Sequence, residues 1–229
     1  PKIRICFSLM TPITNVLIVL NGEQFSAEEL HQWKKHAHAI IAADGGAEAL
    51  KTCNVTPNFI IGDLDSLQGN PLTDYPAATF IYKPEQNETD FQKSLNYAIT
   101  ILKAQKIVVL GAEGDRLDHT LSALSAALPA ARSTSVRFAF RFAIAHLLVP
   151  ESGTLRLRAR PGTLVSLIPI LPTQVAQTEG LHWDASSLHL APGIRDGVSN
   201  RATAEEITVR IQTGALAVFV ERFPHDILW

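Results

Sequence analysis

Four short apolar runs in the first half of the chain constrain its fold more than any other feature of the sequence. They are residues 16–20 (VLIVL), 39–43 (AIIAA), 59–61 (FII) and 107–110 (IVVL), and glycine or aspartate follows each of them within two residues. Runs that are apolar throughout are typical of strands buried on both faces of a parallel sheet. We therefore expect a sheet that is covered by helices on both sides.

Helical patterns separate these runs. Residues 26–36 begin with a serine three residues before Glu29, and residues 89–103 begin with a threonine three residues before Gln92. This is the spacing of a capping box, which marks the start of a helix. Residues 118–128 form a third predicted helix. Strands that alternate with helices predict a doubly wound α/β domain with a parallel sheet.

The second half of the chain changes to the alternating pattern of strands, and it predicts no helix longer than a turn or two. The pattern occurs at residues 136–142, 155–158, 165–168, 207–211 and 215–220. Turn residues separate these segments, among them Pro169, Pro172 and Gly214. We expect an α/β domain over residues 1–145, followed by a small antiparallel β-sandwich domain over residues 146–229.

Composition and charge argue against several classes of partner. With 20 basic and 22 acidic side chains the formal net charge is −2, which predicts no general affinity for nucleic acid or for an anionic membrane. The run at 16–20 is far shorter than a membrane span. Cys6 and Cys53 form no CxxC pair, and a chain of 229 residues needs no disulfide, so we expect a reducing, cytoplasmic location.

Aspartates lie where the predicted strands end. Asp44 follows the second run, Asp63 and Asp65 follow the third, Asp90 begins a helix, and Asp118 follows the fourth run. Ligands of an open parallel sheet bind beyond the carboxyl ends of its strands. In an extended segment, residues two apart such as 63 and 65 point the same way. Converging carboxylates repel one another unless a hard divalent cation neutralises them, and Mg²⁺ prefers oxygen ligands together with substrate phosphates.

Glycines next to these aspartates allow the backbone to approach a ligand closely. They are Gly45, Gly46, Gly62, Gly111 and Gly114. Aspartate and glycine are also ordinary turn residues, and Asp90 beside Thr89 is equally suited to favouring the helix dipole. The spacing therefore predicts a magnesium–phosphate site and leaves the substrate open.

Blocks of sequence in a fixed order resemble the thiamine pyrophosphokinase family. The blocks are ADGGA at 43–47, PNFIIGDLDS at 57–66, TDF at 89–91, GDRLDH at 114–119, VSLIP at 165–169, GLHW at 180–183 and VSN at 198–200. The likeness runs from about Val16 to Val220, nearly the whole chain. It implies an enzyme that transfers the diphosphate of ATP to the hydroxyl of thiamine, with Mg²⁺ as cofactor.

The resemblance also implies roles for individual residues in the first domain. Asp63, Asp65 and Asp90 would be the carboxylates associated with Mg²⁺. Asp44 would position the metal-bound phosphates or the thiamine hydroxyl, and either Asp44 or Asp90 is the better candidate for the general base. The nucleotide would lie along seven residues, namely Gly45, Gly46, Gly62, Gly111, Arg116, Asp118 and His119. For Arg116 the alternative is an ion pair with Asp115 or Asp118, and for His119 it is a purely structural role.

In the second domain the resemblance implies a thiamine site at the interface of a homodimer. Trp183 would stack on a thiamine ring, and Ser199 and Asn200 of the partner subunit would lie close by. Core packing is the alternative for Trp183. The sequence leaves open the base, the number of metal ions, the nucleotide preference, product feedback and the subunit that supplies Trp183.

Three departures from the family pattern affect the nucleotide loop and its surroundings more than the chemistry. Asp115 stands where a second glycine is frequent, Asn87 stands where aspartate is frequent, and residues 138–142 lack acidic side chains. Two other functions remain open on the same residues. One is a Mg²⁺-dependent phosphohydrolase or other nucleotide phosphotransferase, and the other is a non-catalytic sensor of thiamine or nucleotide.

Overall fold

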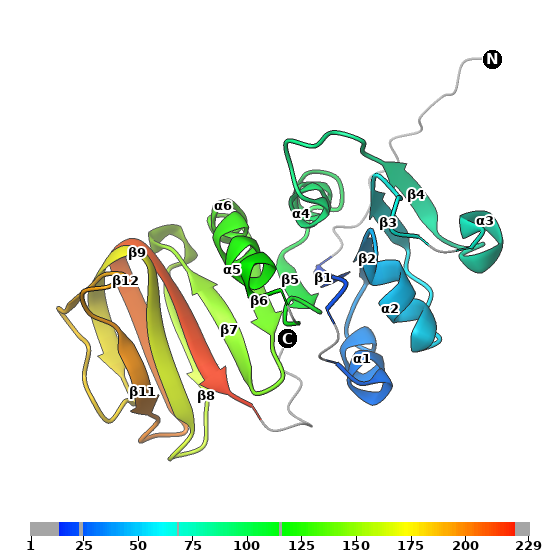
Figure 1. The fold of residues 1–229 in the computed structure, drawn as a ribbon. Coiled ribbons are helices and arrows are strands. Elements are labelled where there is room, and N and C mark those ends of the chain that lie inside the picture. Colours follow the sequence, from blue (N-terminus) through cyan, green and yellow to red (C-terminus); the bar gives the residue numbers. More distant parts are fainter. Residues whose placement is uncertain (1–13, 23–24, 68, 115, 223–229) are drawn as a thin grey trace.

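The computed structural model describes residues 14–22, 25–67, 69–114 and 116–222. Over these residues all the strands belong to one continuous mixed sheet (Figure 1), in the order β10-β9-β12-β7-β6-β5-β1-β2-β3-β4, with β11 paired to β9 and β8 paired to β12. The sheet is parallel from β6 to β4 and antiparallel from β10 to β7, including the β7–β6 pair. One sheet therefore runs through both halves of the chain.

The parallel half confirms the predicted α/β architecture. Its strands are β1 Asn15–Val19, β2 Ala39–Ala43, β3 Phe59–Gly62, β4 Thr79–Tyr82, β5 Lys106–Leu110 and β6 Ser135–Ala139. Its helices are α1 Ala27–Lys34, α2 Gly46–Thr52, α3 Pro71–Asp74, α4 Asp90–Thr100, α5 Leu117–Ala126 and α6 Leu128–Ala131. All four apolar runs form strands that are almost wholly buried, as expected for a sheet covered on both faces.

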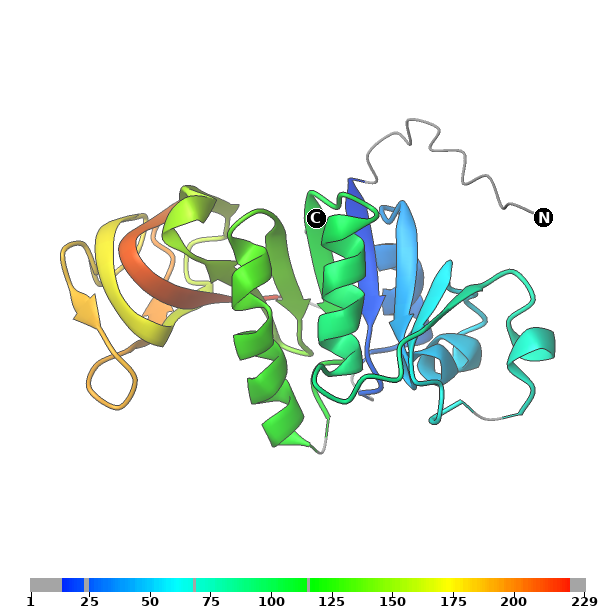
Figure 2. The same ribbon diagram turned by 90° about the horizontal axis from the view of Figure 1, so that it is seen from above.

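Helices cover the two faces of this sheet (Figures 1 and 2). Residues from α4, α5 and α6 pack with one set of strand residues, and residues from α1 and α2 pack with the opposite set. Both predicted helix starts are observed: the hydroxyl oxygens of Ser26 and Thr89 accept hydrogen bonds from the backbone N–H groups of Glu29 and Gln92. Only Thr89 forms the reciprocal half of the box, with the Gln92 side chain.

The antiparallel half contains β7 Ala143–Leu148, a 3₁₀ turn at Pro150–Ser152, β8 Thr154–Arg158, β9 Leu164–Glu179, β10 His189–Leu190, β11 Gly197–Arg201 and β12 Glu206–Glu221. The first part of β9 pairs with the last part of β12, next to β7 and β11. The remaining parts of β9 and β12 pair with each other and with β10 and β8. The two long strands thus pass from one layer to the other and enclose a separate apolar core, as in a sandwich.

The predicted turns at Pro169, Pro172 and Gly214 are wrong. Both prolines lie inside β9, and Gly214 lies inside β12, so two predicted strands are one continuous strand. Gly214 has a φ of +89°, and a Cβ there would lie 2.2 Å from the carbonyl oxygen of Pro172. The turn residues therefore form the irregular bend where the register shifts and the strands change layer.

The segment 136–142 was expected to be a single strand, and this prediction is also wrong. It divides into β6 and a turn before β7. The turn is fixed by hydrogen bonds, because Phe140 N–H donates to the carbonyl of Ala143 and Arg141 N–H donates to the Glu113 carboxylate. Large apolar side chains alternate with basic or small ones through the turn as well, so the sequence pattern does not reveal it. The division of domains after residue 145 stays a prediction, and that residue lies within β7.

Cys53 is a buried free thiol, whereas Cys6 lies outside the described residues. Within the described ranges, no helix has both the length and the apolar character needed to span a bilayer.

A buried ion pair joins the last strand of the antiparallel half to the first helix of the parallel half. Arg222, directly after β12, bonds with its guanidinium to the carboxylate of Glu29 in α1, and the two side chains are 2% and 13% exposed. Its Nε donates to the carbonyl oxygen of Phe140 at 2.6 Å. Glu29 also accepts from Trp33 Nε1, at 3.3 Å. Because these charges have little access to water, each depends on its partner.

We predict that Arg222→Met lowers the free energy of unfolding by about 3 kcal/mol, because the nearly buried Glu29 carboxylate loses its cationic partner. Urea unfolding followed by circular dichroism measures the change. The matched control is Arg210→Met, since Arg210 is exposed within β12, the strand that Arg222 follows, and its effect should be within about 0.5 kcal/mol. Equal losses in the two variants would contradict a special role of the buried pair.

Candidate functional site

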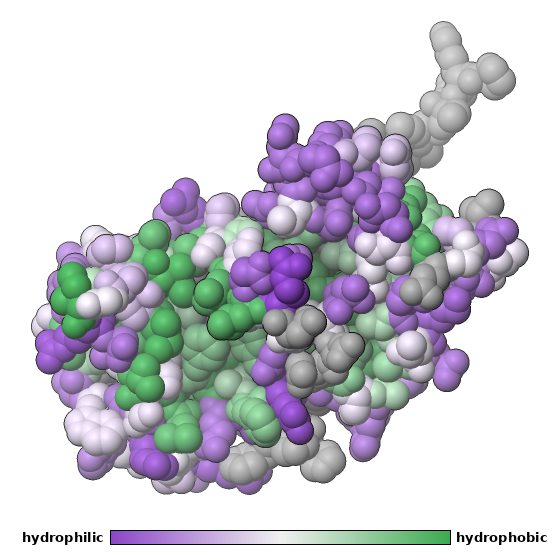
Figure 3. Space-filling model, in the orientation of Figure 1, coloured by the Kyte–Doolittle hydropathy of each residue, from purple (hydrophilic) through white to green (hydrophobic). Residues whose placement is uncertain are grey.

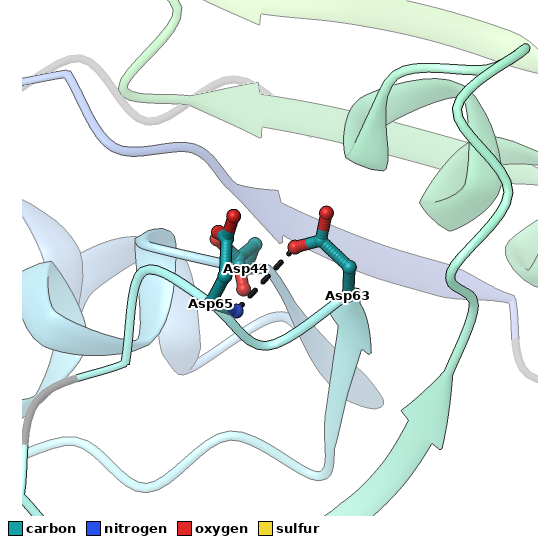
Figure 4. Close-up of side chains that lie close together, drawn as sticks. All are labelled: Asp44, Asp63 and Asp65. Atoms are coloured by element: carbon teal, nitrogen blue, oxygen red, sulfur yellow. Dashed lines mark hydrogen bonds between the residues drawn. The ribbon is translucent and has the colours of Figure 1, made fainter.

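Three aspartates converge at the carboxyl edge of the parallel sheet (Figure 4). Asp44 directly follows β2, and Asp63 and Asp65 lie just after β3. One carboxylate oxygen from each of the three lies within 4.8 Å of the others. Strands β2 and β3 are neighbours, with Ala43 paired to Ile61, so the sheet brings these loops together. The group has the donor set that a hard divalent cation prefers.

Asp44 is held in an unfavourable state. Its residue is 4% exposed, its φ is +41°, and its Oδ1 accepts no hydrogen bond from the described residues. Burial raises the pKa of Asp44, the neighbouring charges of Asp90, Asp63 and Asp65 raise it further, and a hydrogen bond from Ser66 opposes this. Burying a carboxylate oxygen without a hydrogen-bond donor is costly. In a cation-binding site the ion takes the place of the donor, so such an oxygen is typical of one.

Asp63 and Asp65 do not lie on an extended segment, so the prediction that an extended backbone points both side chains the same way is wrong. Leu64 between them has a φ of +65°, and Asp65 N–H donates to Asp63 Oδ1 at 3.4 Å. The pKa of Asp63 is lowered, first by a hydrogen bond from the Gln86 side chain and next by the backbone of Asp65. A turn therefore brings the two carboxylates close together.

Asp90 lies next to this group, at the start of α4. A Cβ on Gly62 would be 2.8 Å from the Cβ of Asp44 and 3.1 Å from the Oδ1 of Asp90, so only glycine fits between the two aspartates. Asp90 Oδ1 accepts a hydrogen bond from Lys93 Nζ at 2.9 Å. The structure thus gathers Asp44, Asp63 and Asp65 and places Asp90 beside them, held by a lysine.

The other predicted glycines are close to the chain itself. A Cβ on Gly46 would lie 2.0 Å from the carbonyl oxygen of Val19, and one on Gly111 would lie 2.4 Å from that of Leu20. Gly45 is tight against the Asn21 side chain, at 2.9 Å. These glycines allow the loops after β1, β2 and β5 to pack against one another. Their contact with a nucleotide stays a prediction.

Arg116, Asp118 and His119 lie at the start of α5 with exposed side chains. The Arg116 guanidinium donates to both oxygens of Asp118, at 2.9 and 2.7 Å, and this lowers the pKa of Asp118 to about 2. The alternative to phosphate contact by Arg116 was an ion pair with Asp115 or Asp118, and the structure forms the pair with Asp118. Asp115 lies outside the described residues. An ion pair this exposed is weak, so a phosphate can replace the carboxylate at little cost.

Trp183 is 57% exposed, which rules out core packing. Its ring meets the His182 ring edge-on, with the centroids 4.6 Å apart. Asn200 in β11 is buried, and its side chain accepts from Trp183 N–H at 3.1 Å and donates to the Trp183 carbonyl at 2.7 Å. Ser199 has a φ of +63°, and its N–H donates to Ser166 Oγ. The Asn200 amide thus holds the backbone of Trp183 in its own chain, so the expectation that Asn200 approaches Trp183 from the partner subunit is wrong.

Trp183 and the aspartate cluster are far apart within one chain. Trp183 is tied to β11, which lies at one end of the molecule, whereas β2 and β3 lie toward the other end (Figures 1 and 2). One copy of the chain therefore does not bring the tryptophan to its own aspartates.

Sequence reasoning missed three residues that contact the aspartates. Ser66 ends the quoted block at 57–66 but was given no role, and Gln86 comes from a loop whose course no local pattern predicted. Lys93 follows Asp90 by three positions in a predicted helix, so the helical period was a signal for this pair.

Comparison with known proteins identifies relatives of both halves. The family model "Thiamin pyrophosphokinase, catalytic domain" matches residues 30–139, and "Thiamin pyrophosphokinase, vitamin B1 binding domain" matches residues 153–216. The curated protein "Thiamin pyrophosphokinase 1" of Caenorhabditis elegans is 29% identical over 211 residues, which cover 86% of this chain and 85% of the relative.

Solved structures share the fold. The thiamin pyrophosphokinase of Geobacillus thermodenitrificans superposes with a TM-score of 0.79 at 21% identity, covering 93% of this chain and all of that one. That of Candida albicans has a TM-score of 0.76 at 21% identity, with 93% and 92% covered. With both domain models matched in order, the chain belongs to the thiamin pyrophosphokinase family, whose known activity is transfer of a diphosphate from ATP to thiamine.

Proposed function

We propose that this chain binds Mg²⁺ at the aspartate cluster and there converts thiamine and ATP to thiamine diphosphate and AMP. The observation that carries the proposal is the convergence of Asp44, Asp63 and Asp65 within 4.8 Å at the carboxyl edge of the sheet. This is where open α/β sheets bind their ligands. We further propose that residues 1–145 hold ATP and the metal and that residues 146–229 hold thiamine.

The residues present fit a magnesium ion. All the donors are carboxylate oxygens, and Asp44, one of the three residues, has a buried Oδ1 without a donor among the described residues. Asp63 and Asp65 would hold the ion with it. Asp90 belongs to the same set, because one of its oxygens is bound by Lys93 and no described residue donates to the other. Bound there, Mg²⁺ would neutralise phosphate charge and stabilise the charge on the leaving AMP.

The chain's own residues would orient the reactants and move one proton. The thiamine hydroxyl attacks the β-phosphorus in line, and no covalent enzyme intermediate is required. Asp44 or Asp90 accepts the hydroxyl proton, since both carboxylates lie beside the cluster at which the reactants would meet. Arg116 exchanges Asp118 for phosphate oxygens, since its planar guanidinium suits bidentate contact. Asp118 and His119 then lie along the nucleotide.

A homodimer would complete the site. Trp183 is remote from the aspartates of its own chain, so a partner copy has to supply it if thiamine is to meet ATP. Exposed apolar side chains near β11, namely Trp183, Ile194 and Val198, support a contact there. Figure 3 shows hydrophobic surface over the antiparallel half of the molecule. We also propose that Ser199 and Asn200 shape this thiamine subsite.

A cytoplasmic location is a separate proposal, and it rests on the cysteine content.

Product analysis with purified protein, ATP and Mg²⁺ tests the function, and we expect AMP to form only when thiamine is added. Formation of ADP regardless of thiamine would support the alternative of a phosphohydrolase or another phosphotransferase. Thiamine binding without any turnover would support a sensor.

Asp65→Asn should reduce turnover by about 100-fold or more while thiamine still binds, because the metal loses a charged ligand that acts on the phosphates. Initial rates and calorimetric thiamine titration measure the two effects. Asp74→Asn is the matched control, since Asp74 is paired with Lys51 outside the cluster. Unchanged turnover in Asp65→Asn would remove this residue from the metal site.

Trp183→Ala should weaken thiamine binding by about 10-fold, because an indole ring stacks on a flat cationic ring. The melting temperature should change little, since the side chain is mostly in solvent. Ile101→Ala is the control, because Ile101 is exposed to the same fraction, 57%, on the parallel half. Normal affinity together with a large loss of stability would contradict the assignment.

Asp44→Asn should stabilise the metal-free protein at pH 7 while weakening metal binding, because a raised pKa means that ionised Asp44 destabilises the fold. The gain should be complete above the raised pKa and should disappear below the ordinary value of 3.8, where the carboxyl is protonated in both folded and unfolded chains. Thermal unfolding in a chelator between pH 3 and 8 measures it. A gain that persists at pH 3 would show that charge is not its cause.

A further inference from the structure

Lys93 is a buried cation beside the aspartate cluster. Only 5% of its side chain is exposed, and its Nζ donates to Asp90 Oδ1 at 2.9 Å and to the carbonyl oxygen of Lys83 at 2.8 Å. Lysine is almost never buried to this extent unless it is paired. The ammonium group thus has two fixed partners, one on each side of the loop between β4 and α4.

This loop connects Lys93 to two of the carboxylates. Lys83 begins the loop directly after β4, and Asp90 ends it as the first residue of α4. Between them Gln86 donates from Nε2 to Asp63 Oδ2 at 3.0 Å. The Lys93 ammonium group therefore joins the two ends of this loop by binding Lys83 and Asp90. The middle of the same loop binds Asp63 through Gln86.

The geometry points to Lys93 as a positioning residue for the metal site. It binds one oxygen of Asp90 and leaves the other without a donor among the described residues. It also fixes the loop that orients Asp63 through Gln86. The inference rests on the proposed function only in taking the ligand of the cluster to be a divalent cation.

Two roles for this charge predict opposite effects on metal binding. If Lys93 only offset negative charge, its removal would leave the site more negative and would strengthen cation binding. If Lys93 positions Asp90 and the loop, its removal lets the carboxylates separate and weakens cation binding, since ligand geometry is lost. The sign of the change in affinity therefore distinguishes positioning from charge compensation.

The test is titration of the full-length, metal-free protein with Mn²⁺ alone, followed by electron paramagnetic resonance of the free ion. We expect Lys93→Met to bind Mn²⁺ about 10-fold more weakly than the unchanged chain, a loss of the size seen when residues behind metal ligands are replaced. Lys51→Met is the matched control, because Lys51 forms an equally short pair with Asp74 on the surface. Its affinity should be unchanged.

A double-mutant cycle with Asp90→Asn isolates the path through Asp90. If Lys93 acts chiefly through this carboxylate, Lys93→Met combined with Asp90→Asn should bind Mn²⁺ no more than about 2-fold more weakly than Asp90→Asn alone. Fully additive losses would refute the path through Asp90, and unchanged affinity or tighter binding in Lys93→Met would overturn the inference as a whole.

Should Lys93→Met fail to fold, Lys93→Gln keeps one donor, and the shift in melting temperature on adding Mn²⁺ gives the same comparison. Lys93→Gln should show a smaller Mn²⁺-induced shift than the unchanged chain, and an equal shift would overturn the inference. The measurements use neither thiamine nor ATP. A failure to form AMP from ATP and thiamine would refute the proposed function, but the Mn²⁺ affinities would still test the role of Lys93.

Discussion

Repulsion among carboxylates at one edge of the sheet is the constraint on which the rest of this structure depends. Parallel pairing of β2 with β3 places the loops that follow them side by side, so Asp44 and Asp63 meet whatever else the chain does. Asp44 is buried with an unfavourable φ and an oxygen that has no donor among the described residues. Such an arrangement is stable only because surrounding groups hold it in place.

Those groups come from several separate elements. Gly62 has no side chain, so Asp44 and Asp90 can approach each other across it. The ammonium group of Lys93 binds Asp90, and the amide of Gln86 binds Asp63. Each contact takes up part of the negative charge or fixes its direction. The cluster is therefore organised before any ligand arrives, which is the condition for catalysis by positioned charge.

The continuous sheet explains how one chain carries two kinds of binding surface. Strands β9 and β12 are 16 residues each and pass through both layers of the antiparallel half. The same β12 pairs with β7, which pairs with β6 of the parallel half, and Arg222 at its end bonds to α1. The exposed Trp183 and the aspartates are therefore carried by opposite ends of one continuous sheet.

The sequence by itself determined the parallel half and the chemistry of its edge. Apolar runs and capping residues report local preferences, and these were enough for the four apolar strands and for the two helices that begin at Ser26 and Thr89. Neither β4 nor α2 was predicted, and α2 begins without a side-chain cap. Tertiary structure alone decided the continuity of β9 and β12, because Pro172 and Gly214 mark a turn or a bend equally well until a partner strand is present. It also decided that Gln86 holds Asp63 and that Asn200 holds Trp183. Such contacts depend on where distant segments meet in space, which no local pattern records.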